Sequence, residues 1–218
     1  MNFIVKKEII LIFDLLNDER LEYILLRNIN NELPSSLTIG KDIDILVHKK
    51  DEAKFVDFFR SNEYKTLRHP YRNEVFLYGM DKFKFKFKNN KNNILFDLNY
   101  QLAVNSLDAG QLFPLDNAIQ ISSWANKRFV KKEGDLSYWT LSYEDEFVSL
   151  VARSVFDKRE FDKGYIKRIC ELLPLIDKEK VVLKLNLIFF KFADNLFKLI
   201  EDSDYYNVTK RYFEFRDY

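Results

Sequence analysis

The sequence predicts an α+β protein, in which a mixed or antiparallel sheet with flanking helices is followed by a C-terminal helical region. Apolar residues recur at helical spacing in residues 3–17 and again after residue 142, whereas residues 64–98 alternate apolar and polar side chains with a period of two. Turn-forming residues at 89–93 join two of the alternating segments as a hairpin, whose strands are antiparallel. A simple doubly wound parallel sheet is therefore excluded.

The composition is typical of a globular protein. The 218 residues, 47% hydrophobic and 32% charged, suffice for one large or two small domains. A formal net charge of +1 argues against a dedicated duplex-binding module and leaves only a local basic patch open. The single Cys170 cannot form an intramolecular disulfide, the N-terminus does not resemble a signal peptide, and charged residues interrupt the longest apolar stretch, residues 181–200. We therefore expect a cytoplasmic protein without a membrane span.

The first half of the chain has the order helix, strand, strand, helix. After the helix of residues 3–17, residues 21–26 form a short buried strand, and the loop of residues 29–40 is rich in turn formers. The strand of residues 42–47 follows, and Asp51 is positioned to cap the next helix. This order places two neighbouring strands between two helices.

The middle of the chain supplies further strands. Residues 82–88 alternate Lys and Phe, which predicts a half-buried strand with Phe on one face and Lys on the other. Residues 94–98 return after the turn as a strongly apolar strand. Two shorter strands are expected at residues 118–121 and 128–131.

Helices dominate the remainder of the chain. Ser142, with Asp145 three residues later, resembles a capping box that starts a helix. Asp177 is a second cap candidate, and further helices are expected at residues 161–173, 178–201 and 205–215. We therefore expect two domains, an α+β domain of residues 1–135 and a helical domain of residues 136–218 packed against it.

Acidic residues stand on one face of the second strand. Asp42 and Asp44 alternate with Ile43 and Ile45, so both carboxylates point away from the side that the isoleucines bury. An aspartate is costly to bury without a partner, so the pair requires a cation or solvent. Asp97, a single acid in the next apolar strand, is the third candidate. Three carboxylates on nearby strands can hold one or two Mg²⁺ or Mn²⁺ ions.

Residues 23–28, 40–47 and 96–102 together resemble the DNA polymerase β-type nucleotidyltransferase superfamily, especially bacterial nucleotidyltransferase-like proteins of the kind linked to surface-polysaccharide genes. The resemblance covers roughly the first half of the chain. It implies a nucleotidyltransferase-like fold in which Asp42 and Asp44 bind metal ions together with a nucleoside triphosphate, and Asp97 completes the site.

The segment upstream of the acids departs from the superfamily pattern. Members typically carry Gly-Ser or Gly-Gly after the first strand, where the backbone approaches phosphate, and this sequence has Arg27-Asn28 instead. The Arg27 guanidinium and the Asn28 amide can both bind phosphate oxygens. We assign Arg27, Asn28, Gly40 and Lys41 to nucleotide binding. Asn99 occupies a position where the subgroup often has a His.

Each of these residues also has a purely structural interpretation. The three acids can be solvated or hydrogen-bonded groups rather than metal ligands. The lysines of residues 82–88 form either a solvated strand face or a track for phosphate. Lys158 and Arg159 lie in a turn between helices, from which they can reach a phosphate.

The favoured function is a metal-dependent nucleotidyltransferase that moves an NMP from an NTP to a hydroxyl of a small molecule, a glycan or a protein. The alternative is a catalytically inactive binding or regulatory module with the same fold, which the Arg27-Asn28 departure favours. A metal-dependent glycosyltransferase ranks third, because only one helix and one strand precede Asp42. The aromatic residues after residue 188 can form either a core or the face of a homo-oligomer.

Overall fold

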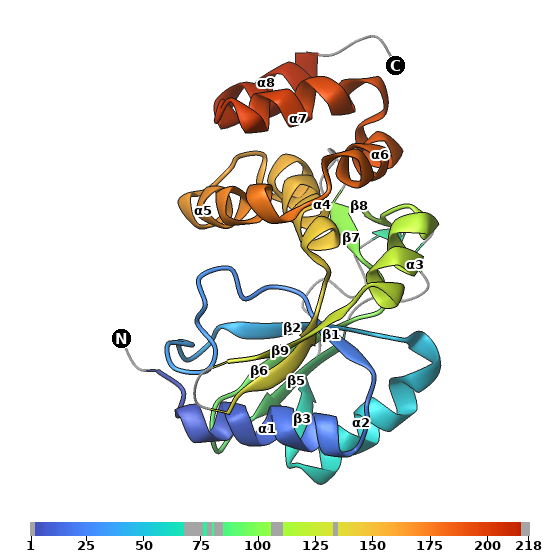
Figure 1. Cartoon of the computed structure of the whole chain (residues 1–218). Helices are drawn as coiled ribbons and strands as arrows, with labels where there is room; N and C mark the ends of the chain where they lie inside the picture. The colour runs from blue at the N-terminus through green and yellow to red at the C-terminus, as the bar shows by residue number, and fades with distance from the viewer. Residues whose placement is uncertain are drawn as a thin grey trace.

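The molecule consists of a sheet-containing half and a stack of helices above it (Figure 1). The computed structural model describes residues 3–67, 76–77, 80, 85–105, 111–132 and 135–214. Within these residues the main sheet has seven strands in the order β3-β5-β6-β2-β1-β10-β9. The predicted α+β class is confirmed, with a mixed and mostly antiparallel sheet followed by C-terminal helices.

The pairing of the strands determines which side chains meet. β2 pairs in parallel with β6, and β1 pairs in parallel with β10, while the other neighbours are antiparallel. The predicted β5–β6 hairpin is confirmed. The strands of this sheet are β1 Tyr23–Leu25, β2 Asp42–Val47, β3 Tyr64–Leu67, β5 Phe85–Asn89, β6 Leu95–Asn99, β9 Arg128–Lys131 and β10 Ser137–Thr140.

Two helices, α1 (Lys6–Asp18) and α2 (Glu52–Ser61), cover one face of the sheet (Figure 1). Ile43 and Ile45 of β2 are buried in this core, as the alternation of the sequence predicts. Aromatic residues fill much of it, and Phe59 of α2 stacks on the ring of a β5 phenylalanine at 4.7 Å between ring centroids. The residues between the isoleucines consequently face the other side of the sheet.

The helical region lies on this second side and shares an apolar core with Ile24 of β1 and Leu46 of β2. A small sheet of β4 (Phe76–Leu77), β8 and β7 lies beside it. The remaining elements are β7 Ala103–Asn105, β8 Gln111–Pro114, α3 Asn117–Ala125, α4 Tyr143–Arg153, α5 Lys163–Leu172, α6 Lys178–Phe189, α7 Ala193–Glu201 and α8 Tyr205–Glu214, with short turns at Lys49–Asp51, Ser154–Lys158, Leu173–Leu175 and Phe190–Phe192.

The strand predicted at residues 118–121 is wrong, because this segment lies in helix α3. Asp116 caps the helix by accepting a hydrogen bond from the Ala118 amide at 2.8 Å. The Gln120 side chain then donates to and accepts from the backbone of Leu102, which fixes the helix against the chain before β7. The strand predicted at residues 128–131 is confirmed as β9.

The single helix predicted over residues 178–201 is also wrong, because the chain breaks between α6 and α7 at Phe190, whose φ is 49°. Phe189 and Phe192, on either side of the break, are both buried. The break turns α7 back, so that both helices direct their apolar residues into one core. Nowhere in the described part of the chain is a helix both long and apolar enough to cross a membrane.

The caps predicted in the helical region are confirmed. Ser142 accepts a hydrogen bond from the Asp145 amide, and Asp177 accepts one from the Lys180 amide. Asp51 does not cap α2 with its side chain. It ends the turn Lys49–Asp51 with φ −96° and ψ 3°, outside the extended conformation of a capping residue, and its carboxylate accepts a hydrogen bond from Lys54 at 2.7 Å.

The expected division into two domains near residue 135 falls between β9 and β10, which pair with each other. Because β10 also pairs with β1, the sheet continues to Thr140, and the helical region starts with α4. The division itself stays a proposal, and this pairing favours placing it after β10. Residues 82–84 of the Lys-Phe segment lie outside the described residues.

Candidate functional site

The three predicted acids lie on the face of the sheet opposite α1 and α2. Asp42 and Asp44 alternate on β2 with isoleucines that are buried in the core below. Asp44 stands directly opposite Asp97 of the parallel strand β6. Asp97 is fully buried and Asp44 is 7% exposed. The alternation of β2 and the register of β6 thus bring the three carboxylates to one side of two neighbouring strands.

Lys86 of β5 binds two of these acids at once. Its Nζ lies 3.0 Å from Asp97 Oδ1 and 3.1 Å from Asp42 Oδ2. The antiparallel register places Lys86 opposite Asp97, which explains the contact. Burial lowers the pKa of Lys86, but its bonds to Asp97 and Asp42 outweigh burial and raise that pKa overall. The ammonium therefore remains charged between the two carboxylates.

Arg27 binds the remaining acid with both arms of its guanidinium. Its Nε donates to Asp44 Oδ2 at 3.0 Å, and a second nitrogen contacts Asp44 Oδ1. Burial lowers the pKa of Arg27, and the charge of Asp44 more than reverses this effect, so the pKa is raised. The Asn99 amide lies 3.5 Å from Asp44 Oδ1 and also approaches the Asp97 backbone carbonyl. Two protein cations thus contact all three acids, and one negative charge remains in excess.

A cavity of about 380 Å³ opens over this face of the sheet. Its walls combine the β2 acids with residues from the loop after β1 and from the helical region. Arg153 of α4 donates to the Tyr165 hydroxyl at 3.3 Å and pairs with Asp157 at 2.9 Å. The lining residues are Arg27, Asn28, Ile29, Asn30, Glu32, Lys41, Asp42, Asp44, Arg153, Lys158, Asp162, Gly164 and Tyr165.

The residues that the sequence assigned to nucleotide binding differ in whether they line the cavity or support the loops beside it. The Asn28 amide lies 3.5 Å from the Tyr138 hydroxyl, and its carbonyl oxygen accepts from the Leu33 amide at 3.1 Å. Asn28 therefore stabilises the loop after β1 while it lines the cavity. Lys41 lines the cavity as well, with its ammonium paired to Glu32. Gly40 has a φ of 92° and serves the turn before β2.

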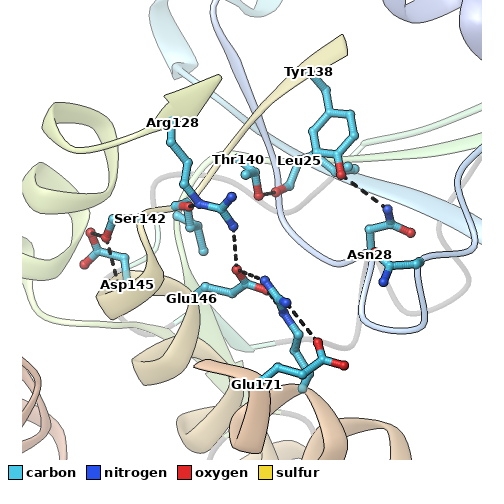
Figure 2. Close-up of polar contacts among 12 residues, drawn as sticks. Leu25, Asn28, Arg128, Tyr138, Thr140, Ser142, Asp145, Glu146 and Glu171 are labelled. Atoms are coloured by element: carbon cyan, nitrogen blue, oxygen red, sulfur yellow. Dashed lines mark hydrogen bonds and ion pairs between the residues drawn. The ribbon is translucent and has the colours of Figure 1, made fainter. Parts of the chain in front are cut away.

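Polar bonds join β10 to β1 and hold the helical region on the sheet (Figure 2). The Thr140 hydroxyl donates to the Leu25 carbonyl at 2.9 Å, which joins β10 to β1. Arg128 of β9 donates to Glu146 of α4 at 3.0 Å. Arg168 of α5 donates to the same carboxylate at 2.7 and 2.8 Å. α4 and α5 are consequently fixed together over the sheet, and both contribute to the cavity wall.

Whether a divalent metal ion fits this site depends on the geometry of the acids. Oxygens of Asp42 and Asp97 already converge on one point, where the Lys86 ammonium lies. Among the described residues no three Asp, Glu, His or Cys side chains group closely enough to hold a metal ion by themselves. Mg²⁺ is commonly held by one or two carboxylates, with waters or phosphates as further ligands. The carboxylate oxygens of Asp42 and Asp97 therefore fit a divalent cation once the Lys86 ammonium moves away.

Three residues that contribute to the site were not anticipated from the sequence. The alternating lysines of residues 82–88 gave no sign that Lys86 would meet two acids, because this contact depends on the β5–β6 register. Lys158 lines the cavity, as one interpretation of the turn allowed, whereas Arg153 and Tyr165 were not anticipated. A polar face on the helix after residue 142 was the only available signal for Arg153.

Solved structures of two other proteins have a similar fold. The antibiotic-resistance factor ANT(2'')-Ia, in a complex with adenylyl-2''-tobramycin, is 12% identical with a TM-score of 0.51, over 84% of this chain and 95% of that chain. An antigenic nucleotidyltransferase-like protein from Paracoccidioides brasiliensis is 14% identical with a TM-score of 0.50, over 94% of this chain and 91% of that chain. The fold is nucleotidyltransferase-like.

No protein-family model and no curated protein sequence matches the chain. At 12–14% identity the structural similarity defines the fold, so the chemistry rests on the residues of the site.

Proposed function

We propose that this protein is a nucleotidyltransferase that uses a divalent cation, Mg²⁺ or Mn²⁺, to transfer an NMP from an NTP to a hydroxyl acceptor. The observation that carries the proposal is the placement of three carboxylates on one face of β2 and β6, beside a cavity lined by both cationic and acidic side chains. A nucleotidyltransferase-like fold agrees with it. The same fold similarity favours nucleotidyl transfer over the glycosyltransferase alternative.

The charges that line the cavity support binding of a cation together with a polyanion. Four cationic side chains are matched by four acidic ones, so the walls alone provide no net attraction for a triphosphate. A divalent cation on the acids would change this balance to positive. We therefore expect NTP binding to require the metal ion. The cationic residues are Arg27, Lys41, Arg153 and Lys158, and the acidic residues are Glu32, Asp42, Asp44 and Asp162.

Each part of the site has a role in this proposal. Asp42 and Asp97 would hold the cation, since their oxygens already meet at one point, and Asp44 would complete the acidic set. A cation bound there would screen the triphosphate and lower the pKa of the acceptor hydroxyl. Arg27 lines the cavity beside Asp44, from which its planar guanidinium can bind a phosphate oxygen.

The helical region would hold the other end of the nucleotide. Arg153 is fixed by Asp157 and Tyr165, so its position is set before a ligand enters. Lys158 is exposed at the cavity wall and can approach a phosphate as a mobile point charge. The identity of the acceptor and the surface-polysaccharide link that the resemblance implies stay predictions.

One observation favours a second function, a nucleotidyltransferase-fold binding or regulatory module without catalysis. Arg27 and Lys86 already pair with all three acids and offset two of their three negative charges, which favours a stable site without any metal ion. Such a module would bind anionic ligands without releasing pyrophosphate.

Pyrophosphate release separates the two functions. The purified chain is incubated with each of the four NTPs, Mg²⁺ or Mn²⁺ and a panel of hydroxyl acceptors, and the Asp44→Asn variant is assayed in parallel. We expect metal-dependent release in the native chain and a loss of about 100-fold or more in Asp44→Asn, because the variant removes one negative charge from the catalytic centre.

Asp57→Asn is the matched control, because Asp57 is exposed on α2, on the opposite side of the sheet. It should retain native activity. NTP binding without pyrophosphate release, unchanged in Asp44→Asn, would exclude the transferase and support the binding module.

A further inference from the structure

Lys86 holds the position that a metal ion would need. Its ammonium contacts one oxygen of Asp42 and one of Asp97, which belong to different strands. β5 carries Lys88 on the same face, but that residue stands opposite Leu95 instead of an acid. Of the two described lysines of β5, the register therefore selects Lys86 for this contact.

We infer that Lys86 is a tethered cation that competes with a divalent metal ion for the position between Asp42 and Asp97. The inference rests on the proposed function only for the place of the metal ion, and it does not depend on the reaction catalysed.

Distances make the two cations mutually exclusive. Mg²⁺ lies about 2.0–2.1 Å from a carboxylate oxygen. Lys86 Nζ lies 3.0 and 3.1 Å from the oxygens of Asp97 and Asp42 that such an ion would use. Two cations at one point between these oxygens would repel each other strongly. Binding of the metal ion therefore requires the ammonium to leave.

Lys86 is able to leave because of its chemistry and exposure. Its side chain is 22% exposed, whereas Asp97 is completely buried. A lysine has a flexible four-carbon stem and an ammonium that water solvates well. The lysine can thus withdraw toward solvent, while the acid cannot.

The exchange of the Lys86 ammonium for a metal ion gives Lys86 one role in the metal-free site and another in the metal-bound site. Without metal, it compensates the buried Asp97 carboxylate, which would otherwise be costly to keep in the folded protein. With metal, its displacement lowers the apparent affinity for the ion. The site would then bind metal firmly only when the phosphates of a nucleotide supply additional ligands.

Metal binding without nucleotide tests the inference directly. Mn²⁺ is titrated into the native chain and into Lys86→Met, and free Mn²⁺ is followed by electron paramagnetic resonance. We expect Lys86→Met to bind Mn²⁺ about tenfold or more tightly than the native chain, the scale on which neighbouring groups alter metal affinity. Lys86→Arg keeps the charge, and Lys88→Met removes a lysine that faces Leu95, so both should bind like the native chain.

Equal or weaker Mn²⁺ binding by Lys86→Met would overturn the inference. Thermal unfolding supplies a second readout, in which Mn²⁺ should raise the Tm of Lys86→Met more than that of the native chain. If Lys86→Met is unfolded without metal, its circular dichroism should become native on addition of Mn²⁺, and failure to do so would also contradict the inference. Pyrophosphate release is measured separately. Mn²⁺ binding as expected without pyrophosphate release would contradict the proposed function and leave this inference intact.

Discussion

Two fully buried aspartates, Asp97 in the sheet and Asp145 in the helical region, each pair with a lysine but differ in their other surroundings. Lys184 lies 2.6 Å from Asp145, and the hydroxyls of Ser122 and Ser142 donate to the other carboxylate oxygen at 3.0 and 2.8 Å. The Asp145 group joins α3, α4 and α6 through dedicated hydrogen bonds, which is typical of a structural network.

Lys86, the lysine beside Asp97, binds two acids, whereas Lys184 pairs with Asp145 alone among the acids of its group. Lys86 also pairs with Asp42, a second acid, which lines the cavity. A carboxylate whose cation can be exchanged for another is suited to binding, whereas a carboxylate surrounded by local hydroxyls is suited to holding helices together. Burial and a lysine partner alone therefore do not distinguish an acid suited to ligand binding from a structural one.

The largest expected difference concerns stability after removal of each acid. Asp145→Ala leaves Lys184 without its buried partner and should lower the free energy of unfolding by about 3–5 kcal/mol. Asp97→Asn should cost less, because Lys86 keeps its pair with Asp42. Urea unfolding of both variants measures the difference. Equal losses would remove the distinction between the two aspartates.

A smaller effect is expected inside the structural network. Ser122→Ala removes a donor to Asp145 and an acceptor for Lys184, whose Nζ lies 2.8 Å from the Ser122 hydroxyl. Because the Lys184–Asp145 ion pair remains, the loss should be about 1 kcal/mol. The same urea measurement checks this value. Pyrophosphate release should be unchanged, and a change in it would connect α3 to catalysis.

The smallest effect is expected at an exposed ion pair outside both aspartate groups. Glu22 accepts a hydrogen bond from Lys127 at 3.0 Å, and this bond lowers the pKa of Glu22 from its usual 4.5. A lowered carboxylate pKa stabilises the folded state above the usual value, and the effect is lost as the pH falls through the lowered value. At pH 7, Glu22→Gln should cost less than about 1 kcal/mol, because solvent screens the pair.

Stability curves of the native chain and Glu22→Gln between pH 7 and pH 3 provide the measurement. The two curves should approach each other toward the acidic end, as Glu22 takes up a proton. A difference that persists there would mean that packing, instead of charge, determines the effect of the substitution.

Local patterns in the sequence were sufficient for much of the fold. Alternation over residues 42–47 places Asp42 and Asp44 on one face, since side chains in a strand point to opposite sides in turn. Ser142 and Asp177 identify two helix starts, because their side chains bond to amides only three residues away. Each of these features depends on neighbours in the chain.

Features that depend on distant segments were decided only by the tertiary structure. The helix at residues 117–125 is held by Leu102, and the break at Phe190 follows from burying two helices in one core. Sequence alone therefore could not exclude a strand within residues 117–125 or a continuous helix through Phe190.

The candidate site shows the same division. The sequence by itself determined that three acids stand in apolar strands, where their charge requires compensation. Only the strand register determined that Asp44 meets Asp97 and that Lys86, among alternating lysines, lies between two carboxylates. Register is a property of pairing between strands, and a shift by one residue would turn Lys86 to the opposite face.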